Sequence, residues 1–452
     1  MELKNKKVLV VGMAKSGIPT VKALSKLGAK VTINDIKSKE KLKDILREIE
    51  DICDEVILGS HPQKIHEYDL IVLSPGVPTD LGFIEKARKE KKKIIGELEL
   101  AYRLSRGKYL AITGTNGKTT TTALVGEIFK NADLETFVVG NIGLAAISKA
   151  LETTEDTNLI TEVSSFQLET IEAFKPKISA ILNITPDHLN RHKTMENYIE
   201  AKANIFRNQD ENDILILNYD NDVTRKLVSK ANCKVIFFSR KEILKEGVCL
   251  ENNDIVVKLN EKKEIICNVN DIYISGKHNL ENALAAVAFA IKAGIKKEVI
   301  KYTLQSFKGV EHRTEYIGEI KGIKFYNDSK GTNPDASIKA VEGLEAPLIL
   351  IAGGMDKGSS FDEFVEAFDG KVKALVLLGE TAVNIKKTAE KYGFYNIFIV
   401  ENMEEAVEKA YEQATEKDTV LLSPACASWD MYESYEVRGI HFKDCVEKLR
   451  RS

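Results

Sequence analysis

The stretch Lys108–Thr122, KYLAITGTNGKTTTT, joins an apolar run to a glycine-rich turn and the start of a helix. This turn has the composition of a phosphate-binding loop. Gly114 and Gly117 allow the backbone to approach phosphate oxygens, and the helix N-terminus behind them presents unpaired N–H groups. Lys118 supplies a positive charge, and the hydroxyl of Thr119 is a ligand for Mg²⁺. The stretch therefore predicts a site for a nucleoside triphosphate.

The loop departs from the strict pattern G-x-x-x-x-G-K-[ST], because Ile112 stands five residues before Gly117. A tight turn that needs glycine for a positive φ would explain the two glycines. It would not explain a lysine and a threonine directly behind them. The order of strand, turn and helix favours the phosphate-binding interpretation.

Composition and length indicate a multi-domain protein of the cytosol. A chain of 452 residues corresponds to roughly three domains of about 150 residues. A net charge of -3 and 7% aromatic residues do not suggest a nucleic-acid-binding surface. The six cysteines are scattered without C-x-x-C spacing, so neither a disulfide framework nor a zinc site is predicted. No apolar run approaches the roughly 18 residues that span a bilayer, so we expect a cytoplasmic protein without membrane insertion.

The N-terminal segment predicts a βαβ unit. Val8–Val11 is an apolar strand, GMAKSG (12–17) opens a helix, and Val31–Ile33 leads to Asp35. A dinucleotide-binding turn would read G-x-G-x-x-G with an acidic residue about 20 positions on. Asp35 fits that pattern, but Ala14 replaces the middle glycine. A nicotinamide-dependent oxidoreductase is therefore an alternative. A more general inference does not need the full motif: a nucleotide-like ligand binds at the ends of these strands.

Two further polar positions follow predicted strands of the central segment. Glu162 ends the strand Leu159–Thr161, where a carboxylate could hold a metal ion opposite Thr119; the alternative is an acidic N-cap for the next helix. His188 follows the strand Ile178–Ile184 and is either structural or a metal contact. Asn279 and Asn282 lie where a helix starts, so they either cap it or contact a base.

The whole chain is predicted to be an α/β protein of three domains. These are a Rossmann-like N-terminal domain (1–96), a central P-loop mononucleotide-binding ATPase domain (97–309) and a C-terminal Rossmann-like domain (310–452). In the last domain strands again end in polar loops, the edge where open α/β sheets bind ligands. The clearest of these loops are NDSKGTN (327–333), GGMDKG (353–358) and SPACASWD (423–430).

Taken in order, these motifs resemble the Mur ligases of peptidoglycan synthesis. The motifs that carry the resemblance are GTNGKTT, GNIG, EVSSFQLE, PDHLNRH, SGKHNLENALAA, EHR, NDSKGTN, GGMDKG and SPACASWD. TGTNGK[ST] is this family's own form of the phosphate loop. SSFQLE and SPACASWD are similar to the branch that adds D-glutamate.

The resemblance implies ATP-dependent amide synthesis through an acyl phosphate. The carboxylate of UDP-N-acetylmuramoyl-L-alanine would take the γ-phosphoryl group of ATP, and the amine of D-glutamate would then displace phosphate. It also implies two Mg²⁺ ions, a carbamylated Lys202 and a monomer with small-molecule substrates only. Folylpolyglutamate synthetases, sister ligases with another amino acid, and a non-catalytic nucleotide-binding regulator remain alternatives.

The resemblance also assigns residues to each ligand. One Mg²⁺ would be held by Thr119 and Glu162, the other by His188 and Lys202. ATP would be contacted by Gly114, Thr115, Asn116, Gly117, Lys118, Thr119, Thr120, Asn279, Arg313 and Asp328. His312 and Lys330 would lie beside the reacting groups, completing a catalytic set with Lys118, Glu162, His188 and Lys202.

For the UDP-linked substrate the resemblance implies Ser16, Asp35, Lys37, Ser74, Gly76, Asn141, Ser164 and His188. For D-glutamate it implies Thr332, Lys357, Ser428 and Tyr435. Tyr435 stands where relatives often carry Phe, which adds a possible hydrogen bond. Lys37 stands where some carry Arg, and a lysine lacks the bidentate geometry for phosphate.

Overall fold

The computed structural model describes residues 1–13, 16–141, 143–274, 276–356 and 358–451. The chain divides into two compact units, which are treated separately below. Unit 1 comprises residues 1–272 and 281–305, and unit 2 comprises 273–280 and 306–452. The predicted boundaries at 96/97 and 309/310 remain a prediction. None of the described helices is both long and apolar enough to cross a bilayer.

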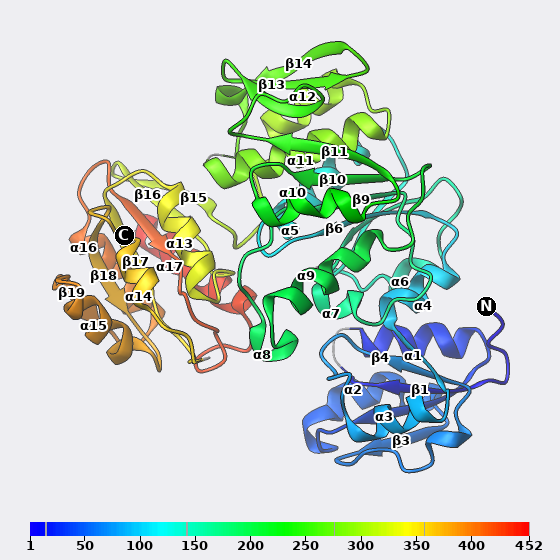
Figure 1. Cartoon of the computed structure of the whole chain (residues 1–452). Coiled ribbons are helices and arrows are strands. Elements are labelled where there is room, and N and C mark those ends of the chain that lie inside the picture. The colour runs from blue at the N-terminus through cyan, green and yellow to red at the C-terminus, as the bar shows by residue number, and fades with distance from the viewer. Residues whose placement is uncertain (14–15, 142, 275, 357, 452) are drawn as a thin grey trace. The chain divides into compact units, whose positions relative to one another are not determined.

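The N-terminal part of unit 1 (Figure 1) is a five-stranded parallel sheet in the order β3-β2-β1-β4-β5. The parallel pairing of its first two strands confirms the predicted βαβ unit. Its strands are β1 (Lys7–Val11), β2 (Lys30–Asp35), β3 (Glu55–Leu58), β4 (Leu70–Leu73) and β5 (Lys93–Gly96). Its helices are α1 (Gly17–Lys26), α2 (Lys43–Ile49) and α3 (Gly82–Lys89). Alternate residues of β1 pack toward opposite helices: Val8 and Val10 join the cluster of α1 and α2, while Leu9 and Val11 join that of α3.

The central part of unit 1 is a nine-stranded sheet in the order β14-β13-β12-β11-β10-β9-β6-β8-β7. Its parallel strands are β6 (Lys108–Thr113), β7 (Thr136–Gly140), β8 (Asn158–Glu162), β9 (Ile178–Ile181), β10 (Ile214–Asn218), β11 (Lys234–Ser239) and β12 (Gly247–Glu251). β13 (Asp254–Leu259) and β14 (Lys262–Asn268) add antiparallel strands, and a turn at Asn252-Asn253 joins β12 to β13. Both turn residues have positive φ, a conformation that asparagine tolerates.

Nine helices of the described chain surround or extend this sheet. They are α4 (Glu97–Leu104), α5 (Lys118–Asn131), α6 (Ile147–Ala150), α7 (Ser165–Leu168), α8 (Leu189–His192), α9 (Met195–Ala203), α10 (Asp222–Lys226), α11 (Lys277–Lys292) and α12 (Lys297–Ser306). The phosphate-loop stretch folds as predicted, because β6 ends at Thr113 and α5 begins at Lys118. One apolar cluster runs from Val8 of β1 to Leu217 of β10, so both sheets of unit 1 share a core.

Unit 2 contains a six-stranded sheet in the order β15-β16-β20-β17-β18-β19. Its strands are β15 (Glu315–Ile320), β16 (Ile323–Asn327), β17 (Leu348–Ala352), β18 (Val372–Leu377), β19 (Ile397–Ile399) and β20 (Thr419–Leu422), of which only β15 is antiparallel. Its helices are α13 (Pro334–Gly343), α14 (Asp362–Glu366), α15 (Ala382–Lys391), α16 (Met403–Gln413) and α17 (Tyr435–Arg451).

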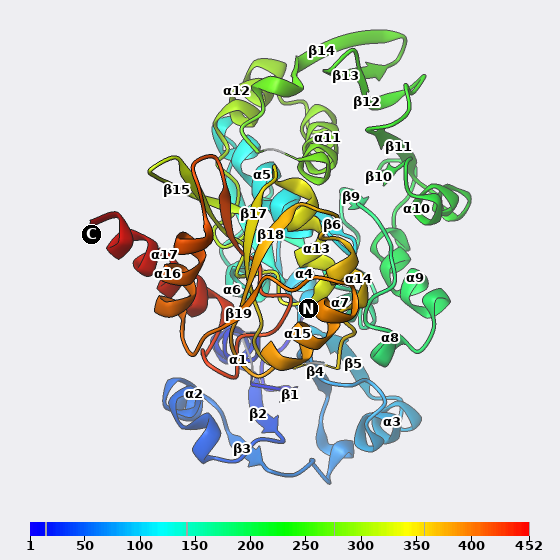
Figure 2. The ribbon, with the colours of Figure 1, turned by 90° about the vertical axis from the view of Figure 1, so that its left-hand side faces the viewer.

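Helices cover both faces of this sheet. Residues of α13, α14 and α15 share one apolar cluster with Leu350 of β17, and residues of α16 and α17 share another with Ile351 of the same strand. Figure 2 shows α16 and α17 side by side. The predicted doubly wound α/β architecture is therefore confirmed.

Candidate active site

The phosphate loop between β6 and α5 depends on glycine at one position in particular. Gly117 is the N-cap of α5 and has φ +81°, in the left-handed region. A Cβ atom there would lie 2.2 Å from Oδ1 of Asn282, which is itself buried and accepts a hydrogen bond from Oγ1 of Thr121 at 3.2 Å. The first N–H groups of α5 have no partner within the helix and point out of its end. This is the geometry that binds phosphate.

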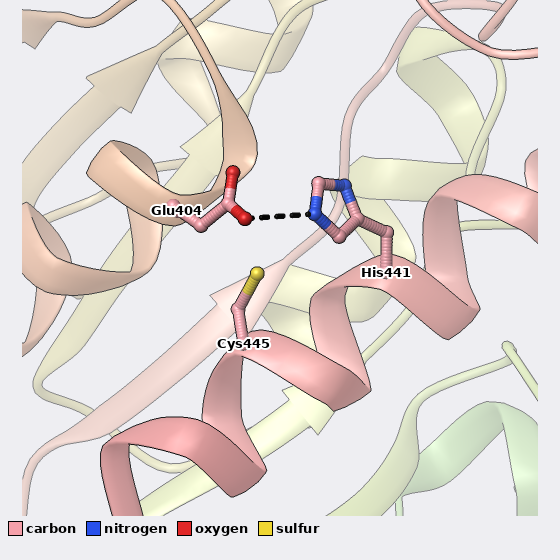
Figure 3. A group of neighbouring side chains, drawn as sticks. All are labelled: Glu404, His441 and Cys445. Atoms are coloured by element: carbon pink, nitrogen blue, oxygen red, sulfur yellow. Dashed lines mark ion pairs between the residues drawn. The ribbon is translucent and has the colours of Figure 1, made fainter. Parts of the chain in front are cut away.

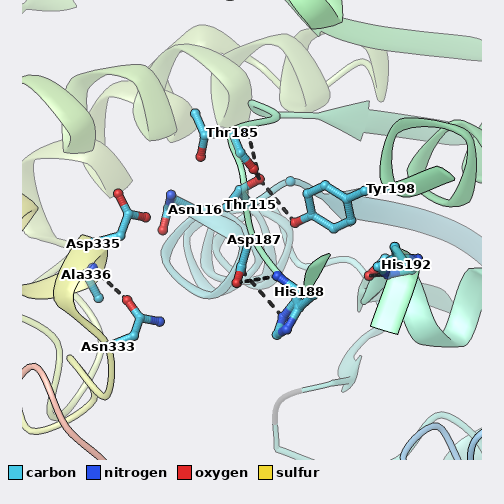
Figure 4. A network of polar contacts seen from close by, with 12 residues as sticks. Thr115, Asn116, Thr185, Asp187, His188, His192, Tyr198, Asn333, Asp335 and Ala336 are labelled. Atoms are coloured by element: carbon cyan, nitrogen blue, oxygen red, sulfur yellow. Dashed lines mark hydrogen bonds and ion pairs between the residues drawn. The ribbon is translucent and has the colours of Figure 1, made fainter. Parts of the chain in front are cut away.

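Asn183, which follows β9, fixes the first half of the loop. The backbone N–H of Thr115 donates to its carbonyl oxygen at 2.9 Å, and the N–H of Asn116 donates to its Oδ1 at 2.8 Å. The hydroxyl of Thr115 lies 3.1 Å from that of Tyr198 and accepts from the N–H of Thr185 at 3.0 Å (Figure 4). The N–H groups of Thr115 and Asn116 are therefore already hydrogen-bonded within the protein. The N–H groups at the start of α5 are the ones that can bind an anion. Sequence reasoning gave Asn183 no role.

Two lysines converge on one carbonyl oxygen of the loop. Nζ of Lys118 donates to the carbonyl oxygen of Gly114 at 2.9 Å, and Nζ of Lys202 donates to the same oxygen at 2.8 Å. Lys202 is only 2% exposed. Burial lowers its pKa well below the usual value, and the positive charge of Lys118 lowers that pKa further. The structure thus brings together two residues that the family resemblance placed in one catalytic set.

Glu162 is placed to bind a cation beside the loop. It ends β8, directly across from Ile112 of β6, and is 2% exposed. Its Oε1 accepts from Nδ2 of Asn141 at 2.9 Å, whereas Oε2 is buried and has no hydrogen-bond partner among the described residues. A buried carboxylate oxygen without a donor suits a hard cation such as Mg²⁺. Thr119, the second predicted ligand, is also buried.

The alternative role for Glu162, the N-cap of the next helix, is wrong. Ser164 caps α7 and forms a capping box with Gln167: its Oγ accepts from the N–H of Gln167 at 3.3 Å, and its own N–H donates to Oε1 of Gln167 at 2.9 Å. The N-cap thus lies two residues after Glu162. It is a short polar residue with an extended backbone, as is preferred at helix N-termini. The carboxylate of Glu162 is therefore not used to cap α7.

His188 is a partly exposed residue at the start of α8. Its φ is +53°, an uncommon conformation for histidine, and its N–H donates to Oδ1 of Asp187 at 2.8 Å. Nε2 lies 3.5 Å from Oδ2 of the same aspartate (Figure 4). His192, one turn later, is buried instead, with Nε2 3.0 Å from Oγ of Ser165. Of these two histidines, His188 is the one with an accessible ring.

The N-terminal sheet gathers five of the eight residues predicted for the UDP-linked substrate near the carboxyl ends of its strands, namely Ser16, Asp35, Lys37, Ser74 and Gly76. Oγ of Ser16 donates to Oγ of Ser74 at 3.1 Å, and Asp35 accepts from the N–H groups of Met13 and Lys37 at 2.8 and 2.9 Å. A Cβ added to Gly76 would meet nothing within 4 Å. Residues 14 and 15 of the GMAKSG turn lie outside the described chain.

Unit 2 brings several predicted residues together around Asp328. This carboxylate is buried and accepts from Oγ of Ser423 at 2.7 Å and from the N–H of Thr314 at 3.1 Å. Burial raises its pKa to about 6, although these donors and Arg313 oppose the shift. His312 is also buried. Its Nδ1 lies 2.9 Å from Nδ2 of Asn327, and burial lowers the pKa of its imidazole.

Lys330 and Tyr435 lie near each other in the same unit. Nζ of Lys330 is 5.5 Å from the ring centroid of Tyr435, a cation–π distance. The ring of His312 lies 6.3 Å from that of Tyr435. Ser428 is buried, Thr332 and Asn279 are part of the same unit, and Lys357 lies outside the described residues. The roles predicted for these residues remain predictions.

Arg438 is a residue of unit 2 that the sequence reasoning missed. Its buried guanidinium donates to Oγ and the carbonyl oxygen of Ser329 at 3.0 and 2.8 Å, and to the carbonyl oxygens of Cys426 and Ala427 at 3.1 and 3.2 Å. It thereby joins the NDSKGTN and SPACASWD loops to α17. The only sequence signal was an arginine on an otherwise mixed helical face, which is common on any surface.

Comparison with known proteins places the chain in a family. Sequence models of three Mur ligase domains match it: the MurD-like N-terminal domain at residues 6–96, the middle domain at 112–290 and the glutamate ligase domain at 312–426. The chain belongs to the Mur ligase family. It is 58% identical over 456 residues to the UDP-N-acetylmuramoylalanine–D-glutamate ligase of Alkaliphilus oremlandii, with 100% of both chains covered. It is 56% identical over 452 residues to the protein of the same name from Clostridioides difficile, again with 100% of both covered.

Solved structures agree on the fold. The UDP-N-acetylmuramate–alanine ligase of Thermotoga maritima aligns with a TM-score of 0.62 at 20% identity, over 98% of this chain and 100% of that one. A MurF ligase of the same organism, in complex with ADP, aligns with a TM-score of 0.60 at 18% identity, over 93% and 96%. The family assignment confirms an ATP-dependent ligase and leaves the nicotinamide-dependent oxidoreductase without support.

Proposed function

We propose that this chain joins D-glutamate to UDP-N-acetylmuramoyl-L-alanine in the ATP-dependent synthesis of a peptidoglycan precursor. The observation that carries this assignment is identity above half of all positions, over the whole chain, to ligases named for that reaction. The phosphate loop and the buried Glu162 supply the chemistry of its ATP-dependent half. The proposed setting is the cytoplasm, and the proposed state is a monomer.

The reaction has two displacements. The alanyl carboxylate attacks the γ-phosphorus of ATP and ADP leaves, which gives an acyl phosphate. The amine of D-glutamate then attacks the acyl carbon, inorganic phosphate leaves, and an amide remains. Two anions must approach in the first step, so electrostatic stabilisation is the largest requirement.

Residues of unit 1 supply that stabilisation in this proposal. The N–H groups at the start of α5 and the ammonium of Lys118 hold the β- and γ-phosphates. Lys118 now donates to loop carbonyls at 2.8 and 2.9 Å and exchanges these contacts for phosphate oxygens. Thr119, Glu162, His188 and Lys202 would hold two Mg²⁺ ions, which neutralise developing charge on the transferred phosphoryl group. The orphaned Oε2 of Glu162 fits this role.

Carbamylation of Lys202 follows from the same reasoning. An amine attacks carbon dioxide only when uncharged: an N–C bond forms, one proton leaves to water, and a carbamate anion results. The burial of Lys202 and its lowered pKa favour that neutral amine. A carbon-13 carbamate resonance after incubation with labelled bicarbonate is expected, and its persistence in Lys202→Arg would contradict the assignment.

The remaining residues divide among the three substrates. Ser16, Asp35, Lys37, Ser74 and Gly76 would contact the uridine diphosphate, with Asn141 and Ser164 near the muramoyl-alanine part. Asn279, Arg313 and Asp328 would contact ATP. Thr332, Lys357, Ser428 and Tyr435 would hold D-glutamate, with His312 and Lys330 beside the reacting groups.

Product analysis tests the assignment. Purified protein would be given ATP, Mg²⁺, UDP-N-acetylmuramoyl-L-alanine and one amino acid at a time, with phosphate release and product mass recorded. We expect one amide product, with D-glutamate. Incorporation of L-glutamate or a diamino acid instead would assign the chain to a sister activity, and ATP binding without any product would indicate a regulator.

A further inference from the structure

Helices α16 and α17 of unit 2 bring three metal-binding side chains together, far from the predicted catalytic residues along the chain. Glu404 lies in the first turn of α16, and His441 and Cys445 are four residues apart on one face of α17. One ligand atom from each lies within 4.8 Å of the other two. Oε1 of Glu404 is 3.5 Å from Nε2 of His441, and the thiol of Cys445 points toward both (Figure 3).

The combination of thiol, imidazole and carboxylate is the donor set of zinc-class cations. Zinc binds sulfur at about 2.3 Å and nitrogen or oxygen at about 2.0–2.2 Å, so ligand atoms around a tetrahedral ion lie roughly 3–4 Å apart. The present side chains need to close by about an ångström or less to reach that spacing. We propose that Glu404, His441 and Cys445 form a site for a zinc-class divalent cation, with the fourth position open to water.

A residue outside the triad supports the proposal. The hydroxyl of Tyr432 lies 2.9 Å from Nδ1 of His441, which leaves Nε2 facing Glu404. Metal-binding histidines generally have their other ring nitrogen held by a hydrogen-bonding partner in this way. The imidazole is therefore oriented before any cation arrives.

A cavity beside the triad supplies space for a bound ion and its water. It measures about 180 Å³ and is lined by Glu404, Val407, Glu408, Cys445, Lys448 and Leu449. The carboxylate of Glu408 gives this cavity a second acidic group. Its open side lets water reach the fourth position of a bound ion.

Two features oppose binding and set its strength. Nζ of Lys448 lies 3.4 Å from Oε1 of Glu404 and competes with a cation for that oxygen. The thiol of Cys445 is buried, and a bound cation must displace its proton to solvent. Replacement of Lys448 should therefore tighten binding, an outcome that packing alone would not predict.

The site was not visible in the sequence because its ligands follow no compact spacing. His441-x-x-x-Cys445 places two ligands on a helix, and the third comes from the preceding helix. A bound ion would connect α16 to the helix that starts at Tyr435 and contains Arg438. Binding to the folded state alone also stabilises that state against unfolding.

Cobalt(II) is the probe for the first test, since a thiolate ligand gives it a charge-transfer band that oxygen ligands do not. The full-length protein, freed of metal with a chelator, would be titrated with Co²⁺ in excess Mg²⁺. We expect a thiolate band in the wild type that is lost in Cys445→Ser and unchanged in Cys53→Ser, whose half-buried thiol lies in unit 1. No thiolate band, or the same band in Cys445→Ser, would overturn the proposal.

Zinc affinity measured by competition with a chromophoric chelator gives the second test. Tyr432→Phe should weaken binding by roughly 10-fold, the lower end for loss of an outer partner of a metal-binding histidine. Lys448→Met should strengthen it. Equal affinity in the wild type and both variants would contradict the proposed geometry, even if all three proteins bind zinc.

Discussion

The phosphate loop of unit 1 and the polar loops of unit 2 are stabilised in different ways. In the phosphate loop the shape depends on Gly117 at positive φ and on loop amides that donate to the carbonyl and side-chain oxygens of Asn183. The loops of unit 2 are held by buried side chains, with Arg438 donating to both. Ala425 in the second of these loops has φ +58°, and its N–H donates to Oγ of Ser337 at 2.9 Å.

The loops of unit 2 therefore share one buried side chain as a donor, whereas the phosphate loop has several separate supports. When Lys118 is removed, the carbonyl oxygen of Gly114 keeps Lys202 as a donor and Asn183 still accepts from two loop amides, so we expect the phosphate loop to keep its form. The loops of unit 2 lose several hydrogen bonds at once when Arg438 is removed, and a buried polar group left without a partner is costly. Substitutions in the two regions should therefore differ in whether activity or stability fails first.

Lys118→Ala should give the largest effect and leave the fold intact. We expect kcat to fall roughly 100-fold or more, as when one preorganised charge or donor is removed from a transition state. The measurement is ATP-dependent product formation together with the thermal midpoint. Lys130→Ala, an exposed lysine in the last turn of the same helix, is the matched control and should match the wild type in both. Turnover unchanged by Lys118→Ala would remove the loop from the mechanism.

Arg438→Ala should instead destabilise unit 2. Four hydrogen bonds to three residues are lost, and the carbonyl oxygens of Ser329 and Cys426 lose this donor, so we expect a loss of about 3 kcal/mol or more in the free energy of unfolding. Urea unfolding is the measurement. Arg438→Lys should recover little, because one ammonium cannot reach four acceptors in the plane of a guanidinium. A normal urea midpoint for Arg438→Ala would contradict the comparison.

The two regions also differ in what the sequence could predict. The phosphate loop, the strand ends and the position of Glu162 follow from short local patterns, so they were predicted correctly. Arg438 contacts Ser329 across 109 positions, and Lys202 reaches Gly114 across 88. No local pattern encodes such pairs, which form only when the sheet brings distant segments together. Lys202 was placed by family resemblance, and Asn183 and Arg438 were missed.

Glu97, at the start of α4, is a buried side chain of unit 1 whose ionisation should lower the stability of the folded state. It is 2% exposed, and its Oε1 accepts from the N–H of Ile147 at 2.7 Å. Burial raises its pKa to about 7 from 4.5. The folded state therefore holds the proton more tightly than the unfolded state, so stability falls as the pH rises from 4.5 to about 7 and levels off above that.

Glu97→Gln should remove this pH dependence while it keeps the acceptor for Ile147. Above about pH 7 the variant should be more stable than the wild type by up to about 3 kcal/mol, and below the unfolded pKa the two should be alike. Urea unfolding across this pH range is the measurement. Parallel curves for the two proteins would show that Glu97 does not titrate in the folded state.

Ser164→Ala should give the smallest effect, since it removes only the N-cap of the short helix α7. The loss of one N-cap hydrogen bond should lower the free energy of unfolding by about 1 kcal/mol, and Ser164→Thr should restore most of it. If Ser164 also contacts the UDP-linked substrate, its removal raises the KM for that substrate beyond what the lost stability explains. Comparing the alanine and threonine variants in both assays separates the two roles, because threonine preserves the hydroxyl and the cap together. A KM unchanged in Ser164→Ala would limit this serine to capping and would leave contact with the muramoyl-alanine part to Asn141.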